Sequence, residues 1–274
     1  MNNHPIGFLD SGVGGLTVVK EVMKIMPEET IYYIGDSARN PYGPRSQEEV
    51  LMFTRQLANF LVSKGSKLLV IACNTATVAA LDILKRELDI PVIGVIESGS
   101  RAAVEQSQNK KIGIIATQGT VRSNEYEKQI AHLLGGAELQ SVACPRFVSI
   151  VEKDRYEDER AKQIVAEELT PFKGSEMDTL VLGCTHYPLL QDIIQDYFGR
   201  GLTLIDPGVE TAKYLKSDLL ERNLKNKTDE TKKDHVFYTT GAAETFTAIA
   251  KNWLQLEQFC VKHIPIKEIE TYAK

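Results

Sequence analysis

Two segments of the chain repeat one pattern: residues 68–77 read LLVIACNTAT, and residues 179–188 read TLVLGCTHYP. In each, an apolar run of strand length is followed by a cysteine, then by hydroxyl or amide side chains, and then by a helix-forming stretch. Cys73 and Cys184 occupy matching positions, 111 residues apart (184 − 73). Such runs are typical of strands covered on both faces, and ligands bind at the carboxyl edge of parallel sheets. The repeat therefore predicts two thiols at equivalent edges of two similar halves.

A second repeat precedes the first in each half, since residues 6–11 (IGFLDS) resemble residues 112–117 (IGIIAT) at an offset of 106 (112 − 6). Two repeats in the same order indicate an internal duplication. Strand-like runs alternate with helical patterns along the chain, which is typical of parallel sheets. We therefore expect an α/β fold of two similar domains, each with a mostly parallel sheet flanked by helices.

Local signals predict the remaining elements. Ser46 and Glu49 form a capping box for a helix that Gly65 ends. Further strands are expected at residues 30–34, 92–95, 139–143, 202–206 and 235–240. Further helices are expected at residues 74–88, 123–134, 153–171, 207–222 and 243–254. Residues 224–234 are charged and almost without apolar side chains, so we expect a solvated loop there.

The composition argues against two classes of partner. The formal net charge of −5 and the pI near 5.7 leave no basic footprint for nucleic acid. No apolar run approaches the roughly 18 residues of a membrane span. The chain enters a strand-like run at Ile6, which leaves no room for a signal peptide. We therefore predict a cytoplasmic protein with no nucleic-acid or membrane partner.

No cofactor or metal site is predicted. The four cysteines (Cys73, Cys144, Cys184 and Cys260) contain no C-x-x-C pair, so neither a zinc ribbon nor a thioredoxin-like site is indicated. The glycine cluster at residues 12–15 lacks the G-K-[ST] ending of a phosphate loop and fails the dinucleotide fingerprint. It is a tight strand-to-helix turn or a ligand-binding turn, and both interpretations stay open.

The thiols carry the predicted chemistry. One cysteine at the end of a strand is usually an inert core residue, but the repeat favours function for both. A thiolate is a base as well as a nucleophile, and a helix N-terminus favours it; we expect a helix after each thiol. Uncharged donors suited to a small carboxylate stand nearby at Ser11, Asn74, Thr75 and Thr185, while Asp10 and His186 can tune a thiol. Two thiols that face each other suit proton removal from one side of a carbon and return to the other.

Four segments together resemble the glutamate racemase family: DSGVGGLTV (10–18), PYG (41–43), CNTAT (73–77) and GCTHYP (183–188). The resemblance runs from Ile6 to about Leu254. It implies a cofactor-independent isomerase that interconverts L-glutamate and D-glutamate for bacterial peptidoglycan, commonly as a homodimer. It also implies pseudo-twofold domains with the site between them. We place the discontinuous first domain at residues 1–97 plus 208–274 and the second at residues 98–207.

The resemblance also implies residue roles. Cys73 removes the α-proton of D-glutamate with help from Asp10, and Cys184 removes that of L-glutamate with help from Glu152 and His186. Substrate contacts are expected from residues of the matching segments: Asp10, Ser11, Pro41, Tyr42, Gly43, Asn74, Thr75, Thr117, Thr120, Thr185 and His186. The chain departs from the family pattern at Arg146 and Ser149, before Glu152, and at Ser98 and Ser100, near the expected domain junction.

Three other functions stay open. A cysteine hydrolase could use Cys184, His186 and Glu152 as a triad and would leave Cys73 idle. A two-lobed amino-acid-binding protein would bind glutamate without turnover. An aspartate racemase would share the two thiols, and parallel assays with the two L-amino acids would separate it from a glutamate racemase.

Overall fold

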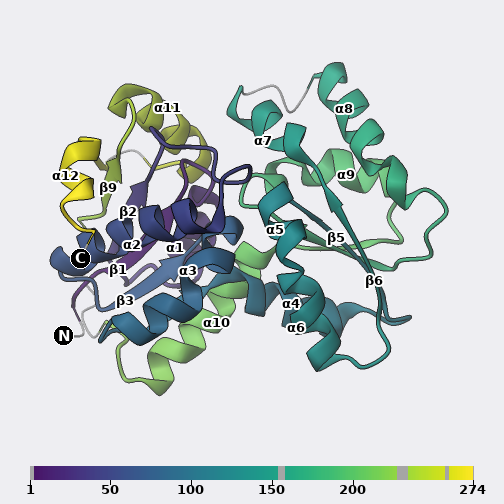
Figure 1. Cartoon of the computed structure of the whole chain (residues 1–274), viewed down its shortest axis with the longest axis horizontal. Coiled ribbons are helices and arrows are strands. Elements are labelled where there is room, and N and C mark those ends of the chain that lie inside the picture. The colour runs from purple at the N-terminus through teal and green to yellow at the C-terminus, as the bar shows by residue number, and fades with distance from the viewer. Residues whose placement is uncertain (1–2, 154–157, 227–233, 257–258, 274) are drawn as a thin grey trace.

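Two lobes, each built on a parallel sheet with helices on both faces, make up the computed structural model (Figure 1), which describes residues 3–153, 158–226, 234–256 and 259–273. The sheet of the first lobe has the order β10-β9-β2-β1-β3-β4. Its strands are β1 (Ile6–Asp10), β2 (Ile31–Gly35), β3 (Leu68–Ile71), β4 (Val92–Gly94), β9 (Val236–Thr239) and β10 (Cys260–His263). The predicted α/β class is confirmed.

The sheet of the second lobe has the order β6-β5-β7-β8. Its strands are β5 (Lys111–Ala116), β6 (Glu138–Ala143), β7 (Thr179–Gly183) and β8 (Thr203–Ile205). Strand β1 pairs with β3, and β5 pairs in the same way with β7. The order β2-β1-β3-β4 is thus matched by β6-β5-β7-β8, which agrees with the repeats in the sequence. All residues of β1, β3 and β7 are buried, as expected for strands covered on both faces.

Helices cover both sheets. Those of the first half are α1 (Leu16–Ile25), α2 (Gln47–Ser63), α3 (Asn74–Glu87), α4 (Val95–Gln106), α5 (Gln118–Ser123) and α6 (Glu125–Leu133). Those of the second are α7 (Pro145–Glu152), α8 (Glu159–Leu169), α9 (Gln191–Phe198), α10 (Pro207–Glu221), α11 (Ala243–Leu254) and α12 (Ile266–Glu270). The predicted capping box of α2 is present, and Gly65 adopts a φ of 84° just beyond its end.

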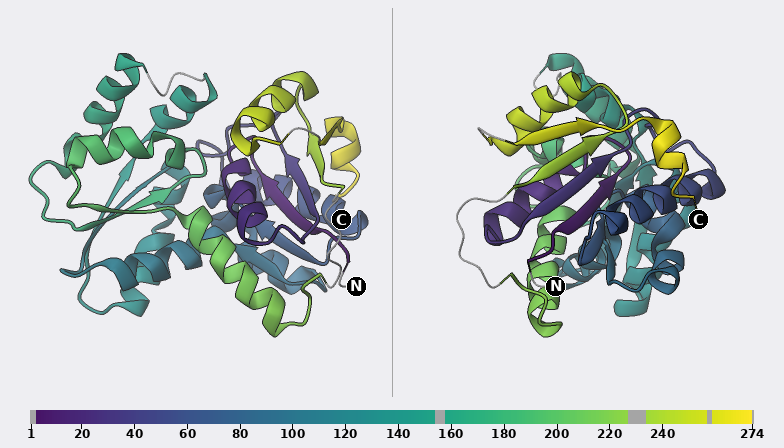
Figure 2. Two further views of the ribbon diagram at one scale, coloured as in Figure 1. Left: turned by 180° about the vertical axis from the view of Figure 1, so that it is seen from behind. Right: turned by 90° about the vertical axis from the view of Figure 1, so that its left-hand side faces the viewer.

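Helix α10 ties the lobes together. It packs against α1 of the first lobe and against α4, which itself contacts β7 and α6 of the second. Seen from behind, α10 runs across the junction toward the end of the molecule that holds both termini (Figure 2). The chain thus returns to the first lobe after β8, and β9 joins the first sheet beside β2.

Several elements differ from the sequence prediction. The helix expected at residues 123–134 is α6, which begins at Glu125 because Asn124 adopts a left-handed conformation (φ 54°), and the short helix α5 before it was not predicted. The strand expected at residues 92–95 ends at Gly94, and α4 begins at Val95. Helix α7, strand β10 and helix α12 were not predicted, and residues 227–233 of the expected loop lie outside the described residues.

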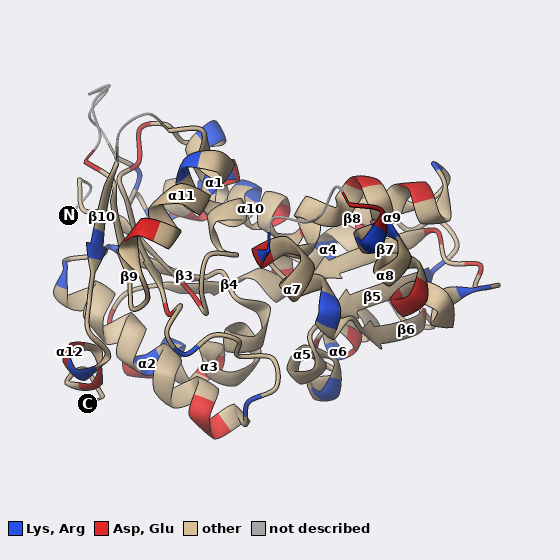
Figure 3. Ribbon diagram, turned by 90° about the horizontal axis from the view of Figure 1, so that it is seen from above, with Lys and Arg blue, Asp and Glu red and all other residues tan. Residues whose placement is uncertain are grey.

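Charge is mixed on the outside of the molecule. Basic and acidic residues are interspersed over the outer helices of both lobes (Figure 3), as the ordinary composition suggests. Within the described ranges, no helix is both long and apolar enough to cross a bilayer.

Candidate active site

The carboxyl ends of the central strands meet where the lobes touch. Asp10 ends β1 and Cys73 follows β3 in the first lobe, while Thr117 follows β5 and Cys184 follows β7 in the second. Side chains from these ends bond across the junction. For example, Thr185 Oγ1 donates to Asp10 Oδ1 at 3.5 Å. The structure thus brings the two repeated segments to one site.

Cys73 is the N-cap of α3. Its sulfur accepts a hydrogen bond from the backbone N–H of Ala76 at 3.4 Å, and the thiol donates to Ser11 Oγ at 3.8 Å. The thiol lies at this helix start, as predicted, and it is buried. Burial, followed by the neighbouring carboxyl of Asp10, raises the pKa of Cys73 to about 12.

Cys184 begins a chain of three polar groups. Its sulfur lies 3.8 Å from Nδ1 of His186, and Nε2 of His186 lies 3.3 Å from Oε1 of Glu152. Burial alone would lower the pKa of His186, but the contacts with Cys184 and Glu152 outweigh it and raise the pKa to about 10. The imidazole thus lies between the thiol of Cys184 and the carboxyl group of Glu152.

The prediction of a helix directly after Cys184 is wrong. The chain instead makes a short 3-10 turn over Tyr187–Leu190, with an N–H of Tyr187 that donates to the carbonyl of Cys184, and α9 begins only at Gln191. Pro188 has no N–H and cannot make the i→i−4 bond to Cys184 that an α-helix requires here. The polar group beside this thiol is therefore the imidazole of His186, and not the N-terminus of an α-helix.

Asp10 is completely buried between the thiols' segments. Its Oδ2 accepts a bond from the backbone N–H of Gly12 at 3.0 Å. Burial raises the pKa of Asp10, although the positive charge of His186 and the bond from Gly12 oppose this effect. The pKa of this carboxyl is thus above that of an exposed aspartate.

Threonine hydroxyls from both lobes form a second contact across the junction. Thr75 Oγ1 lies 2.9 Å from Thr117 Oγ1 and 3.4 Å from Thr120 Oγ1, and the last two are 3.1 Å apart. Nearby, Tyr126 donates to Asn74 Oδ1 at 2.7 Å. Asn74, Thr75, Thr117 and Thr120, which the family resemblance implies as substrate contacts, therefore lie together at the junction.

The PYG loop (residues 41–43) also reaches the second lobe. The carbonyl of Gly43 accepts a bond from the N–H of Gly119 at 3.0 Å, and a Cβ on Gly43 would lie 3.0 Å from Thr117. The Tyr42 side chain is buried, and its hydroxyl donates to Asp36 Oδ2 at 2.5 Å. The side chain of Tyr42 therefore anchors the loop to the first lobe.

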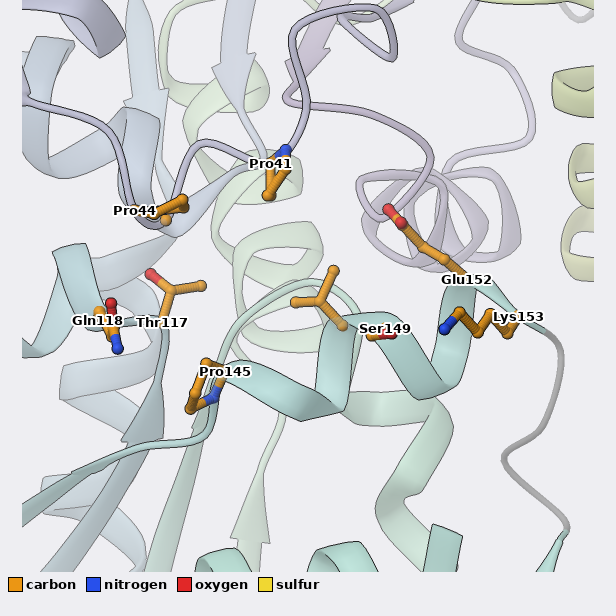
Figure 4. A pocket seen from close by; sticks show the side chains of 10 residues that line it. Pro41, Pro44, Thr117, Gln118, Pro145, Ser149, Glu152 and Lys153 are labelled. Carbon is orange, nitrogen blue, oxygen red and sulfur yellow. The ribbon is translucent and has the colours of Figure 1, made fainter. Parts of the chain in front are cut away.

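Two cavities lie at the junction and share Glu152. One, of about 370 Å³, is lined by Pro41 and Pro44 of the first lobe and by Thr117, Ser149 and Glu152 of the second (Figure 4). The other, of about 250 Å³, is lined by Gly12, Asn40, Glu152 and the start of α11. Neither thiol lines these two cavities, and both are buried, with Cys73 6% and Cys184 7% exposed.

The four departures from the family pattern lie in different surroundings. Arg146 is an exposed residue that pairs with Glu167 and Glu168 of α8, whereas Ser149 lines the larger cavity. Ser98 and Ser100 are buried in α4, and among the described residues the hydroxyl of Ser100 has no hydrogen-bond partner.

Three residues make contacts at the site that the sequence did not predict. Asn40 Nδ2 donates to Glu152 Oε1 at 2.8 Å, and Thr17 Oγ1 donates to the carbonyl of Thr185 at 2.9 Å. Tyr126 holds Asn74 from the second lobe. Asn40 precedes the PYG loop directly, and Thr17 lies inside the DSGVGGLTV segment. Their closeness to these two segments is the sequence signal that could have identified them.

Known proteins share this architecture and sequence. The sequence model of the Asp/Glu/hydantoin racemase family matches residues 16–215. Glutamate racemase from Listeria monocytogenes is 52% identical over 261 residues, which cover 95% of this chain and 98% of that protein. Among solved structures, glutamate racemase RacE1 from Bacillus anthracis superposes with a TM-score of 0.93 at 42% identity, over 97% of this chain and 99% of that one. The glutamate racemase of Francisella tularensis, solved with D-glutamate, superposes with a TM-score of 0.90 at 36% identity over the same shares.

Proposed function

The chain belongs to the Asp/Glu/hydantoin racemase family, and from that premise we propose that it is a glutamate racemase that uses Cys73 and Cys184 as its two acid/base groups. The observation that carries the proposal is the placement of two buried thiols at matching strand ends on either side of one junction. Relatives with near-complete coverage are glutamate racemases, and one was solved with D-glutamate bound.

The proposed reaction needs only the two thiols. With L-glutamate, the thiolate of Cys184 forms an S–H bond to the α-proton, and the electron pair of the broken C–H bond is delocalised into the α-carboxylate. The S–H of Cys73 then gives its proton to the opposite face and leaves Cys73 as a thiolate. With D-glutamate the two roles exchange. The enzyme is thus a racemase that works without a cofactor, and bases on opposite faces explain inversion without a swivelling substrate.

The groups around each thiol support these acid and base roles. The imidazolium of His186, held by Glu152, stabilises negative charge that develops on Cys184. Asp10 stands beside Cys73 and is suited to exchange a proton with it. The hydroxyls of Ser11, Thr75 and Thr185, with the amide of Asn74, are uncharged donors for the substrate carboxylates and do not neutralise the thiols.

Removal of each thiol tests the proposal. Cys73→Ser and Cys184→Ser should each lower kcat for racemisation by several orders of magnitude, because a serine hydroxyl is a far weaker base than a thiol near neutral pH. Polarimetry in both directions measures the loss, and unfolding curves check that each variant is folded. Near-normal turnover by folded Cys73→Ser would overturn the two-thiol assignment and favour the hydrolase. Parallel assays with L-aspartate test the aspartate alternative.

Isotope incorporation distinguishes two bases from one. In deuterium oxide, D-glutamate formed early from L-glutamate should carry deuterium, because Cys73 has already exchanged with solvent. The remaining L-glutamate should stay largely protonated. Mass spectrometry of the separated enantiomers, extrapolated to zero conversion, gives the ratio of label. Retention of the original proton in the early product would refute the roles of Cys73 and Cys184.

We extend the proposal to the biological setting. The product D-glutamate would supply peptidoglycan synthesis in the cytoplasm of a bacterium, and the active form would be a homodimer. The two domains would be a discontinuous first domain, residues 1–97 plus 208–274, and a second domain, residues 98–207. Sedimentation measures the oligomeric state, and growth of a racemase-deficient strain with and without added D-glutamate tests the supply role.

A further inference from the structure

One side-chain hydrogen bond joins the loop before the PYG segment to the end of α7. Asn40 Nδ2, in the first lobe, donates to Oε1 of Glu152, in the second, at 2.8 Å. The same oxygen lies 3.3 Å from Nε2 of His186, whose Nδ1 lies 3.8 Å from the sulfur of Cys184. We propose that Asn40 is a positioning residue that fixes Glu152 from across the junction, so that Glu152 can orient His186 toward Cys184. This inference rests on the proposed role of Cys184.

Glu152 needs a second partner because its own surroundings hold it weakly. It is the last residue of α7, where the helix dipole disfavours a negative charge, and its side chain is 32% exposed. A glutamate side chain also loses considerable rotational freedom when it is held in one rotamer. A donor on Oε1 restricts the carboxylate to the orientation that faces His186. The carboxylate in turn determines which ring nitrogen of His186 faces it.

Asn40 is itself held in a rigid setting. The neighbouring Arg39 donates from Nε to Asp36 Oδ2 at 2.7 Å, and its carbonyl accepts a bond from Arg45 Nε at 3.0 Å. On the other side, the Asn40 amide lies against the glycine turn, since a Cβ on Gly12 would be 3.4 Å from its Cγ. The amide therefore acts from a fixed loop and can hold a more exposed carboxylate in place.

The charge of the donor also matters. Burial raises the pKa of Glu152, but the bonds from His186 and Asn40 outweigh it and hold the pKa below its ordinary value. The charged or titratable groups around this carboxylate are His186, Asp10 and the adjacent Lys153. An amide donates to the ionised carboxylate and adds no charge of its own. An aspartate at position 40 would place a second negative charge there.

Asn40→Ala tests the proposal. The expected result is a fall of about fivefold to tenfold in kcat/KM for glutamate, the size of one partly exposed hydrogen bond to a charged group. The acid limb of the kcat/KM profile should move to higher pH, because the ionised form of Glu152 loses a donor; Asn40→Asp should move it further. Asn59→Ala is the matched control, since it removes an amide bond to the carbonyl of Tyr272, remote from the junction. It should leave both readouts unchanged.

An isotope effect separates positioning from a general loss of structure. If Cys184 is the misaligned base, the primary isotope effect on kcat/KM should rise for α-deuterated L-glutamate and fall for α-deuterated D-glutamate. A merely structural defect would move both in the same direction. Asn40→Ser gives a second variant with the long amide removed, should Asn40→Ala fail to fold.

A double-mutant cycle closes the test. Once Glu152→Ala has removed the carboxylate, Asn40→Ala should have little further effect on kcat/KM. Additive losses, or a change in KM with no shift of the pH profile, would overturn the inference. Failure of the proposed function is a different result: the unaltered enzyme would not racemise glutamate, or Glu152→Ala would retain full activity.

Discussion

Gly14→Ala should lower kcat/KM for racemisation strongly, although the substitution adds only one methyl group. A Cβ on Gly14 would lie 2.3 Å from Oγ1 of Thr185 and 2.5 Å from Cε1 of His186, both in the other lobe. An ordinary contact begins at 3.4 Å, so Thr185 must retreat by about 1 Å (3.4 − 2.3). The backbone of Gly14 has no left-handed φ, so alanine introduces no strain in the main chain. The methyl group therefore acts by pushing the Cys184 segment away from the Cys73 segment.

The expected size follows from that displacement. A misplacement of about 1 Å in a reacting geometry lowers the rate by about 10²-fold, whereas overpacking costs about 1–3 kcal/mol of stability. Racemisation followed by polarimetry gives kcat/KM, and thermal unfolding gives stability. Gly12→Ala is the control in the same turn, because the three atoms nearest to its Cβ would belong to the Asn40 side chain, all at ordinary contact distances of 3.4 Å or more. Folded Gly14→Ala with kcat/KM within twofold of the unaltered enzyme would refute the close approach of the lobes.

The remaining predictions concern stability and cofactors. Lys67→Met should cost about 3–5 kcal/mol of stability, because it leaves Glu29 buried without the ammonium that lies 2.6 Å away; chemical unfolding measures it. Asp206→Asn should raise the melting temperature more at pH 7 than at pH 4. Burial raises the folded-state pKa of Asp206 to about 6, so the ionised carboxylate destabilises the fold above that pH but not below the unfolded-state value near 4. An equal gain at both pH values would contradict this reasoning. Racemisation should persist in EDTA, and activity that returns only with a divalent ion would show a metal requirement.

The repeated segments predicted the most about this molecule. Their apolar runs are the buried strands β3 and β7, and their cysteines follow at the junction. Both outcomes depend on local sequence: strand burial on two faces leaves a continuous apolar run, and the residue after such a strand lies at the sheet edge. The match between the two halves predicted that the edges would be equivalent.

Elements with weak local patterns were missed. Strand β10 (Cys260–His263) is an edge strand with mostly exposed side chains, so no alternation marks it. Helix α7 has Pro145 in its first turn and buries Phe147, Ile150 and Val151, a pattern that could have been recognised. The 3-10 turn after Cys184 is explained by Pro188, because a proline at this position cannot donate the backbone hydrogen bond of an α-helix.

Contacts between distant residues could not be predicted from the sequence alone. Asn40 and Glu152 are 112 residues apart, and each lies at the end of an ordinary-looking segment. Their bond depends on how the lobes dock, and helix α10, which packs against both α1 and α4, is one of the elements that join them. A loop residue that binds across a junction carries no periodic signal of its own.

The two thiols have opposite electrostatic surroundings, and this difference bears on how the cycle resets. Cys184 lies 3.8 Å from Nδ1 of His186, whereas the carboxyl of Asp10 lies near Cys73 and, after burial, helps raise the pKa of Cys73 to about 12. In the proposed two-thiol mechanism, the raised pKa of Cys73 favours its protonated form, which is the form that acts as the acid when L-glutamate is the substrate. D-glutamate requires the less favoured thiolate at Cys73. The substrate can supply the compensating charge, because an α-ammonium bound near Asp10 would offset the carboxylate and stabilise that thiolate only while glutamate is present.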